Sequence, residues 1–340
     1  MAFYNICGSS QSSLNAFWLE IGEKTVPINV STLPYDFYYC PAVVYNDEIH
    51  LLGFSDNQTG HYKWNGNEWV SVSTLPYNFV YGSAVVYNGE IHILGGGASA
   101  TSHYKWNGSE WSKVSTLPYS FKWGCAVVYN NQIHILGSQY SSSYYKYHYK
   151  FNGSSWSSAS TLPYNFYRSS AVVYNNEIHI FSSDYGTRYW KYHYKWNGSS
   201  WSSVSTLPYS FSYGSAVVLN NEIHIMGSNY NNDTKKLHYK WNGTSWSNVS
   251  TLPCNFYDGS AVVLNGEIHI LGGRGSDFYK YHYNILHNPI IEGYVKQGTK
   301  IYYPSTSSPI TNNLQQITDG YLVTADGEVK ISVNSEDLEV

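Results

Sequence analysis

Charged residues are scarce in this sequence. Asp, Glu, Lys and Arg together make up 12% of the 340 residues, and the formal net charge is −4. The 19 Lys and Arg residues are dispersed, whereas a nucleic-acid surface gathers basic residues on one face. We therefore expect no nucleic-acid partner.

Cysteine is also rare. The four cysteines, Cys7, Cys40, Cys125 and Cys254, have no CxxC spacing and stand at places that are not equivalent. A disulfide framework or a zinc site would need paired spacings, so we interpret all four as free thiols.

Long apolar runs are missing as well. No segment approaches the length that crosses a membrane, and residues 1–13 lack the basic start and apolar run of a secretory signal. We expect a protein that is made in the cytoplasm without a signal peptide and does not insert into a membrane.

Tyrosine, by contrast, is abundant. The chain has 36 Tyr, aromatic residues make up 18% of it, and apolar residues make up 42%. This composition is rich enough for a packed core and differs from that of a disordered chain. No stretch shows a helical period that competes with the strand pattern, so an all-β fold is expected.

One sequence repeat occurs six times and makes up most of the chain. Its tetrad STLP recurs at spacings of 42, 42, 45, 45 and 45 residues, and AVVYN or AVVLN also occurs six times. A period of this length is typical of a solenoid or a propeller. The tetrads begin at Ser31, Ser73, Ser115, Ser160, Ser205 and Ser250, and the pentads begin at Ala42, Ala84, Ala126, Ala171, Ala216 and Ala261.

Each copy predicts four short antiparallel strands. In the second copy, AVVY and EIHILG flank Asn88-Gly89, a pair that tolerates positive φ and favours a type I′ turn. A second hairpin turns at Asn107-Gly108, and the proline of STLP ends its last strand. Four strands in each of six copies predict a six-bladed β-propeller.

The repeat region begins and ends with incomplete copies. Residues 15–30 hold half a repeat before the first STLP, and the sixth copy stops after its third strand at 279–285. We predict that residues near 26–30 supply the missing fourth strand of the last blade, because an open blade edge would invite aggregation.

The strand pattern also carries a family resemblance. A hydrophobic strand ends near Gly95-Gly96 and Gly272-Gly273, and a Tyr precedes a Trp by seven residues in five copies. Over roughly residues 17–286 the sequence resembles the kelch repeat family, which implies a propeller. The fourth copy departs from the pattern, with Ser182-Ser183 in place of the glycine pair, and the sixth copy lacks the Trp. The five pairs are Tyr62/Trp69, Tyr104/Trp111, Tyr149/Trp156, Tyr194/Trp201 and Tyr239/Trp246.

The sequence divides into an N-terminal extension (1–16), the propeller (17–286) and a small C-terminal β module (287–340). Runs at 293–295, 300–303, 321–324 and 328–333 read as strands of the module, with Asp326-Gly327 as a hairpin turn. About 50 residues make a small core, so the module is expected to dock on the propeller or on another chain. It resembles small β modules of bacteriophage and prophage structural proteins, which implies contacts with other virion proteins.

Twelve of the 13 histidines occupy two repeat positions. A metal site is one interpretation, but metal–nitrogen bonds of about 2 Å cannot join equivalent positions of separate blades. We prefer hydrogen bonding between strands, and we expect no metal and no cofactor. The regularly spaced Trp residues are interpreted as packing residues. The same interpretation applies to the tyrosines that follow Leu-Pro in the repeat, here called the LPY tyrosines: Tyr35, Tyr77, Tyr119, Tyr164 and Tyr209. The histidines are His50, His92, His134, His179, His224 and His269, with His61, His103, His148, His193, His238 and His282.

The copies differ most in the loops of one face. In each copy, the turn between the first and second strands and the turn between the third and fourth strands lie on one face of the propeller. The loop between the second and third strands and the connection to the next blade lie on the opposite face. These loops, here called the loop face, are variable and rich in aromatics, as binding surfaces are; drift after duplication is the alternative. The candidate binding residues are Tyr38, Tyr39, Tyr81, Trp123, Tyr167, Arg168, Tyr213, Tyr257 and Asp258 between blades, with Tyr144, Tyr185, Arg188, Trp190, Tyr230 and Arg274 within blades.

These features favour a non-enzymatic binding protein. Aromatic rings with Asn, Asp and Arg suit a glycan or a protein on a cell surface, and the phage-like tail favours a virion component, such as a tail or head fibre, that recognises the host. Two alternatives stay open: a cytosolic protein–protein scaffold, and an enzyme, since copper-dependent galactose oxidase has a kelch propeller. No catalytic motif stands out from the repeat.

Overall fold

The computed structural model is built of strands and turns. It describes residues 15–16, 20–55, 58–97, 99–140, 143–166, 168–182, 191–228, 234–274, 280–292, 295–297, 300–304, 314–316, 321–323 and 330–332. These residues contain no α-helix, so none of them forms a helix long and apolar enough to span a bilayer. The all-β prediction is confirmed.

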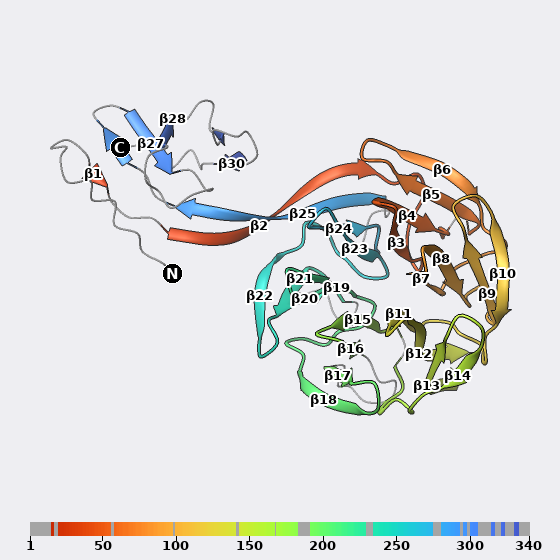
Figure 1. Ribbon diagram of the computed structural model, residues 1–340. Helices are drawn as coiled ribbons and strands as arrows, with labels where there is room; N and C mark the ends of the chain where they lie inside the picture. The colour runs from red at the N-terminus through yellow and green to blue at the C-terminus, as the bar shows by residue number, and fades with distance from the viewer. Residues whose placement is uncertain are drawn as a thin grey trace. The chain divides into compact units, whose positions relative to one another are not determined.

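Six four-stranded antiparallel sheets are arranged around a central axis (Figure 1). In each sheet the first strand is innermost, and first strands of neighbouring blades contact one another in a closed circle. The six-bladed propeller is therefore confirmed. Blade 1 comprises β3 (Ala42–Tyr45), β4 (Glu48–Leu52), β5 (Gly60–Trp64) and β6 (Trp69–Thr74); blade 2, β7 (Ser83–Tyr87), β8 (Glu90–Leu94), β9 (Ser102–Trp106) and β10 (Trp111–Thr116); blade 3, β11 (Cys125–Tyr129), β12 (Gln132–Tyr140), β13 (Ser143–Phe151) and β14 (Trp156–Ser158); blade 4, β15 (Ser170–Tyr174), β16 (Glu177–Ser182), β17 (Tyr192–Trp196) and β18 (Trp201–Thr206); blade 5, β19 (Ser215–Leu219), β20 (Glu222–Met226), β21 (Leu237–Trp241) and β22 (Trp246–Thr251).

The sixth blade joins the two ends of the repeat region. From the rim to the axis, its strands are β2 (Glu20–Thr32), β25 (Tyr281–Glu292), β24 (Glu267–Leu271) and β23 (Ser260–Leu264). The N-terminal strand β2 is therefore the outermost strand of this blade. Just after β2, the Leu33 amide donates to the Lys280 carbonyl at 2.8 Å. The prediction that an N-terminal strand closes the last blade is confirmed, and β2 covers the edge that β25 would expose.

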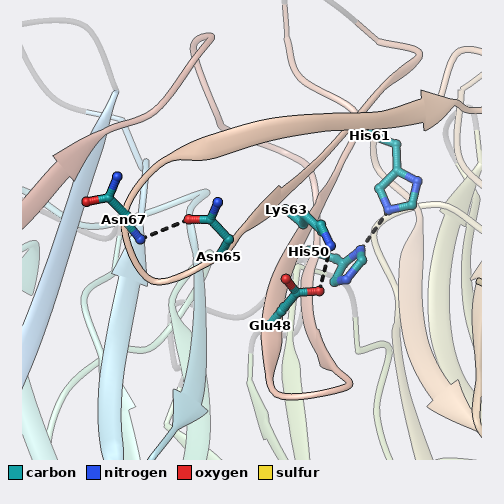
Figure 2. Close-up of polar contacts among 6 residues, drawn as sticks. All are labelled: Glu48, His50, His61, Lys63, Asn65 and Asn67. Atoms are coloured by element: carbon teal, nitrogen blue, oxygen red, sulfur yellow. Dashed lines mark hydrogen bonds and ion pairs between the residues drawn. The ribbon is translucent and has the colours of Figure 1, made fainter.

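The tight turns follow the sequence closely. In the first hairpin of each blade both turn residues have positive φ, as in Asn46 (51°) and Asp47 (58°), which is the type I′ geometry. The second hairpin has a four-residue loop in which Asn65 Oδ1 accepts from the amides of Asn67 and Glu68, each at 2.9 Å (Figure 2). An Asn at this place therefore supplies the acceptor that the turn amides need.

The core lies between neighbouring blades. In one cluster, Val43, Tyr45 and Leu52 of blade 1 pack against Ile91, Ile93 and Trp106 of blade 2, and all six are buried. LPY tyrosines join this packing, and the Tyr77 hydroxyl donates to the Gly95 carbonyl at 2.7 Å. Each blade thus buries its faces against two neighbours, as the packing interpretation of the Trp and Tyr sets requires.

Residues Pro27–Ile285 form one compact unit, and Met1–Val26 with Leu286–Val340 form a second. The second unit contains a sheet with the order β1-β26-β27-β28 and a β29–β30 pair. Four of these strands match the predicted runs to within two residues, whereas β1 and β28 were not expected. The bounds are β1 (Asn15–Ala16), β26 (Val295–Gln297), β27 (Lys300–Pro304), β28 (Leu314–Gln316), β29 (Tyr321–Val323) and β30 (Lys330–Ser332).

Candidate functional site: a rosette on the propeller axis

Six of the candidate residues occupy one equivalent position, just before the innermost strand of each blade. We call this set the rosette; its members in chain order are Tyr39, Tyr81, Trp123, Arg168, Tyr213 and Asp258. All six have a left-handed backbone, with φ between 52° for Arg168 and 66° for Tyr81. Residues other than glycine rarely adopt this conformation, and each such residue costs about 1–3 kcal/mol.

The backbones of the rosette form a closed ring of hydrogen bonds. The Tyr81 amide donates to the Tyr39 carbonyl at 2.8 Å, and the same bond links each member to the one before it. The Tyr39 amide completes the ring by donating to the Asp258 carbonyl at 2.8 Å. Six bonds, one per blade junction, therefore fix these residues around the axis.

The rosette side chains converge over the axis. The Tyr39 ring lies 5.1 Å from Tyr81 and 4.8 Å from Trp123, two blades away, and the Tyr81 and Trp123 rings are 4.1 Å apart between centroids. The Arg168 guanidinium lies over Trp123 at 4.4 Å and over Tyr213 at 4.1 Å. This geometry places a cation between two aromatic faces.

Asp258 is the one acidic member of the rosette. Only 8% of its surface is exposed, and burial raises the pKa of its carboxyl well above the usual range. Arg168, Arg274 and a hydrogen bond from Tyr39 oppose this rise. Tyr39 in turn accepts a hydrogen bond from Arg274 Nη1 at 2.7 Å, and burial raises the pKa of Tyr39 to about 12.

An axial pocket lies at the rosette. Its volume is about 250 Å³, and it is lined by the rosette, by serines of the following layer and by the first alanines of four innermost strands, Ala42, Ala84, Ala126 and Ala171. Ser83 Oγ accepts from the Ala126 amide and Ser260 Oγ from the Ala42 amide, each at 3.1 Å. The pocket is therefore polar below the rosette and apolar at the alanine layer.

The other candidate residues surround the rosette or lie outside the described part. Tyr38 and the exposed Arg274 are adjacent, with the guanidinium carbon 5.8 Å from the Tyr38 ring centroid. Tyr257 is buried, while the five rosette members other than Asp258 are half-buried. The aromatic positions between blades thus turn toward the axis as well as toward solvent. Tyr167, Tyr185, Arg188, Trp190 and Tyr230, and the side chain of Tyr144, fall outside what the structure describes.

The histidines form one buried pair in each blade. His50 Nδ1 and His61 Nε2 lie 2.9 Å apart, and Glu48 instead pairs with Lys63 at 2.9 Å (Figure 2). Burial lowers the pKa of His50 to about 4 and of His61 to about 3, so both are neutral at pH 7. The predicted hydrogen bonding between strands is confirmed, with a second histidine as the partner. The other pairs are His92–His103, His134–His148, His179–His193, His224–His238 and His269–His282.

The histidine pairs continue into the next blade. His61 Nδ1 lies 2.8 Å from Ser73 Oγ, and Trp111 Nε1 of blade 2 donates to the same oxygen at 3.0 Å. The serine of STLP and the Trp of the seven-residue spacing thus form a polar link across the blade junction. Within the described residues, no group of three His, Cys, Asp or Glu side chains could hold a metal ion.

The sequence pointed to the rosette residues but did not reveal that they converge. Their shared repeat position was visible, whereas the left-handed backbone that turns six large side chains toward one axis was not. An aromatic or charged residue recurring just before each innermost strand is the signal that could have found it.

No protein-family model and no curated protein matches the chain. Among solved structures, one titled "Structure of YjhT" is similar, with a TM-score of 0.66 and 15% identity, covering 77% of this chain and 99% of that one. At this identity the likeness concerns the fold alone. Together with the six sheets, it identifies the chain as a six-bladed β-propeller protein.

Proposed function

We propose that this protein is a non-enzymatic binding protein that recognises carbohydrate through its loop face, centred on the rosette. One observation carries the proposal: six large or charged residues hold a left-handed backbone where glycine would avoid the strain. Strain of this kind is concentrated at functional sites. The exposed parts of the half-buried aromatic rings suit contact with sugar C–H groups, and Arg168, Arg274 and Asp258 suit hydrogen bonding to hydroxyls.

Glycan-array binding of the intact protein tests this proposal. We expect wild-type protein to bind a subset of cell-surface oligosaccharides, and a folded Trp123→Gly variant to lose that binding. The glycine keeps the local φ of 60° without strain and removes the ring. Absence of binding to any glycan, with capture of a cell-surface protein instead, would move the function to protein recognition.

An acid–base enzyme is the second candidate, because a buried carboxyl with a raised pKa is typical of catalytic sites. Asp258 is, however, the only carboxyl among the rosette residues, whereas glycoside hydrolysis usually needs two. Incubating the protein with its bound glycan and recording NMR spectra separates the classes, since a binding protein leaves the glycan unchanged.

The setting that we propose is a virion, where the protein would recognise a host surface and contact other virion proteins through residues 287–340. The resemblance of this segment to phage β modules supports the setting. Mass spectrometry of purified particles tests it, and a chain found only in the cytosol with protein partners would support the scaffold alternative.

A further inference from the structure

Asp258 lines the axial pocket and has a buried side-chain oxygen without a described hydrogen-bond donor. Its side chain is more than nine-tenths buried, it lines the pocket, and no described residue donates a hydrogen bond to Oδ2. A buried polar atom without a partner costs about 1–3 kcal/mol, so native structures rarely keep one. A ligand group that bonds Oδ2 would therefore gain more at this atom than at a solvated one.

The charges around Asp258 limit what that group can be. Arg168 lines the pocket, and Arg274 acts on the same carboxyl from outside the lining, so an ammonium group bound at Asp258 would be repelled by both guanidinium groups. A ligand carboxylate would meet the carboxyl of Asp258 itself. An uncharged hydroxyl avoids both penalties. It also suits either protonation state of Asp258, because a hydroxyl can both donate and accept.

The pocket has room for such a group. Its volume of about 250 Å³ far exceeds the roughly 30 Å³ of one water molecule. Arg168, which lines the same pocket as Asp258, lies between the rings of Trp123 and Tyr213, so polar and aromatic groups adjoin one another in the lining. A sugar residue presents the same combination of hydroxyls and C–H faces.

We infer that Asp258 is the specificity-determining residue for an uncharged, polyhydroxylated ligand, a neutral sugar residue with one hydroxyl bound in the axial pocket. This inference rests on the proposed carbohydrate-binding function and narrows it. Arg274 donates a hydrogen bond to the Tyr39 hydroxyl, and both residues act on the Asp258 carboxyl, so we assign them a positioning role.

The test compares three matched probes, galactose, galactosamine and galacturonic acid, each displayed at the end of the same oligosaccharide, by titration against the wild-type protein. The neutral probe is expected to bind about tenfold or more tightly than either charged one. Equal or tighter binding of the amine or the acid would overturn the inference, and this comparison needs no variant. If none of the three binds, the same comparison is made with the neutral, amino and acidic glycans of the array. Failure of every carbohydrate to bind would reject the proposed function and this inference with it.

Two variants then locate the effect. Asp258→Gly keeps the left-handed backbone, removes both carboxyl oxygens and should weaken binding of the neutral probe about tenfold, because the hydrogen bond to Oδ2 is lost. Asp47→Gly removes a carboxyl from another left-handed position, in a first-hairpin turn of the opposite face, and it should leave the affinity unchanged. Wild-type affinity in a folded Asp258→Gly variant would reject Asp258 while leaving carbohydrate binding intact.

Discussion

The amide of Tyr39 donates to the carbonyl of Asp258 at 2.8 Å, and this bond joins the first blade to the last. It completes the hydrogen-bonded ring at the axis, while β2 completes the same junction at the rim by pairing with β25. The propeller is therefore closed twice, at its innermost and outermost radii.

Deletion of residues 1–30 is expected to destabilise the whole propeller, because it removes most of β2 and exposes the edge of β25. Thermal melts should show a large drop in Tm, with aggregation in size-exclusion chromatography. Deletion of residues 1–14 leaves β2 intact and is the control. An unchanged melt of the longer deletion would exclude closure by β2.

The polar link between blades offers a matched pair of serines. Ser73→Ala removes the acceptor of Trp111 Nε1 and the partner of His61 Nδ1, so it should lower the free energy of unfolding by about 1–3 kcal/mol. At the equivalent Ser160 junction, Trp201 Nε1 has no described hydrogen-bond partner, and Ser160→Ala should change stability by about 0.5 kcal/mol or less. Equal losses in urea denaturation would contradict the role assigned to the link.

Stability should fall as pH falls below about 6.5. The unfolded chain then binds protons on its histidines, whereas burial keeps the pKa of His92 at about 4 and of His103 at about 3 in the folded state. Each such histidine removes up to about 1.4 kcal/mol per pH unit between these values. Melts between pH 7.5 and 5 should show a steep decline, and replacing both residues by Gln should reduce it. A flat profile would contradict the neutral, buried pairs.

The strain at the rosette can be measured directly. Tyr81→Gly and Tyr81→Ala both remove the ring that contacts Trp123, but only alanine retains a side chain at a φ of 66°. We expect the glycine variant to be more stable than the alanine variant by about 1 kcal/mol. A more stable alanine variant would mean that the left-handed backbone carries no cost at this position.

The sequence specified the scaffold well because its signals are local. Asn88-Gly89 favours a type I′ turn, STLP ends the fourth strands, and the incomplete copies at the two ends complete one blade. The interior of the candidate site depends instead on where the loops turn. In the sequence, Asp258 is one of several variable loop residues. Its burial and its raised pKa follow only from its position at the propeller axis. The histidine partner was missed for a related reason, because His50 and His61 meet diagonally rather than directly across the strands.

The most direct test of the account is the affinity of Trp123→Gly for glycans that bind the wild-type protein, measured beside Glu110→Ala in a turn of the opposite face. We predict a loss of about tenfold or more for Trp123→Gly, since this change removes the ring that contacts Tyr39, Tyr81 and Arg168 at the centre of the rosette, and wild-type affinity for Glu110→Ala. Wild-type affinity in folded Trp123→Gly, or an equal loss in both variants, would contradict a binding site centred on the rosette.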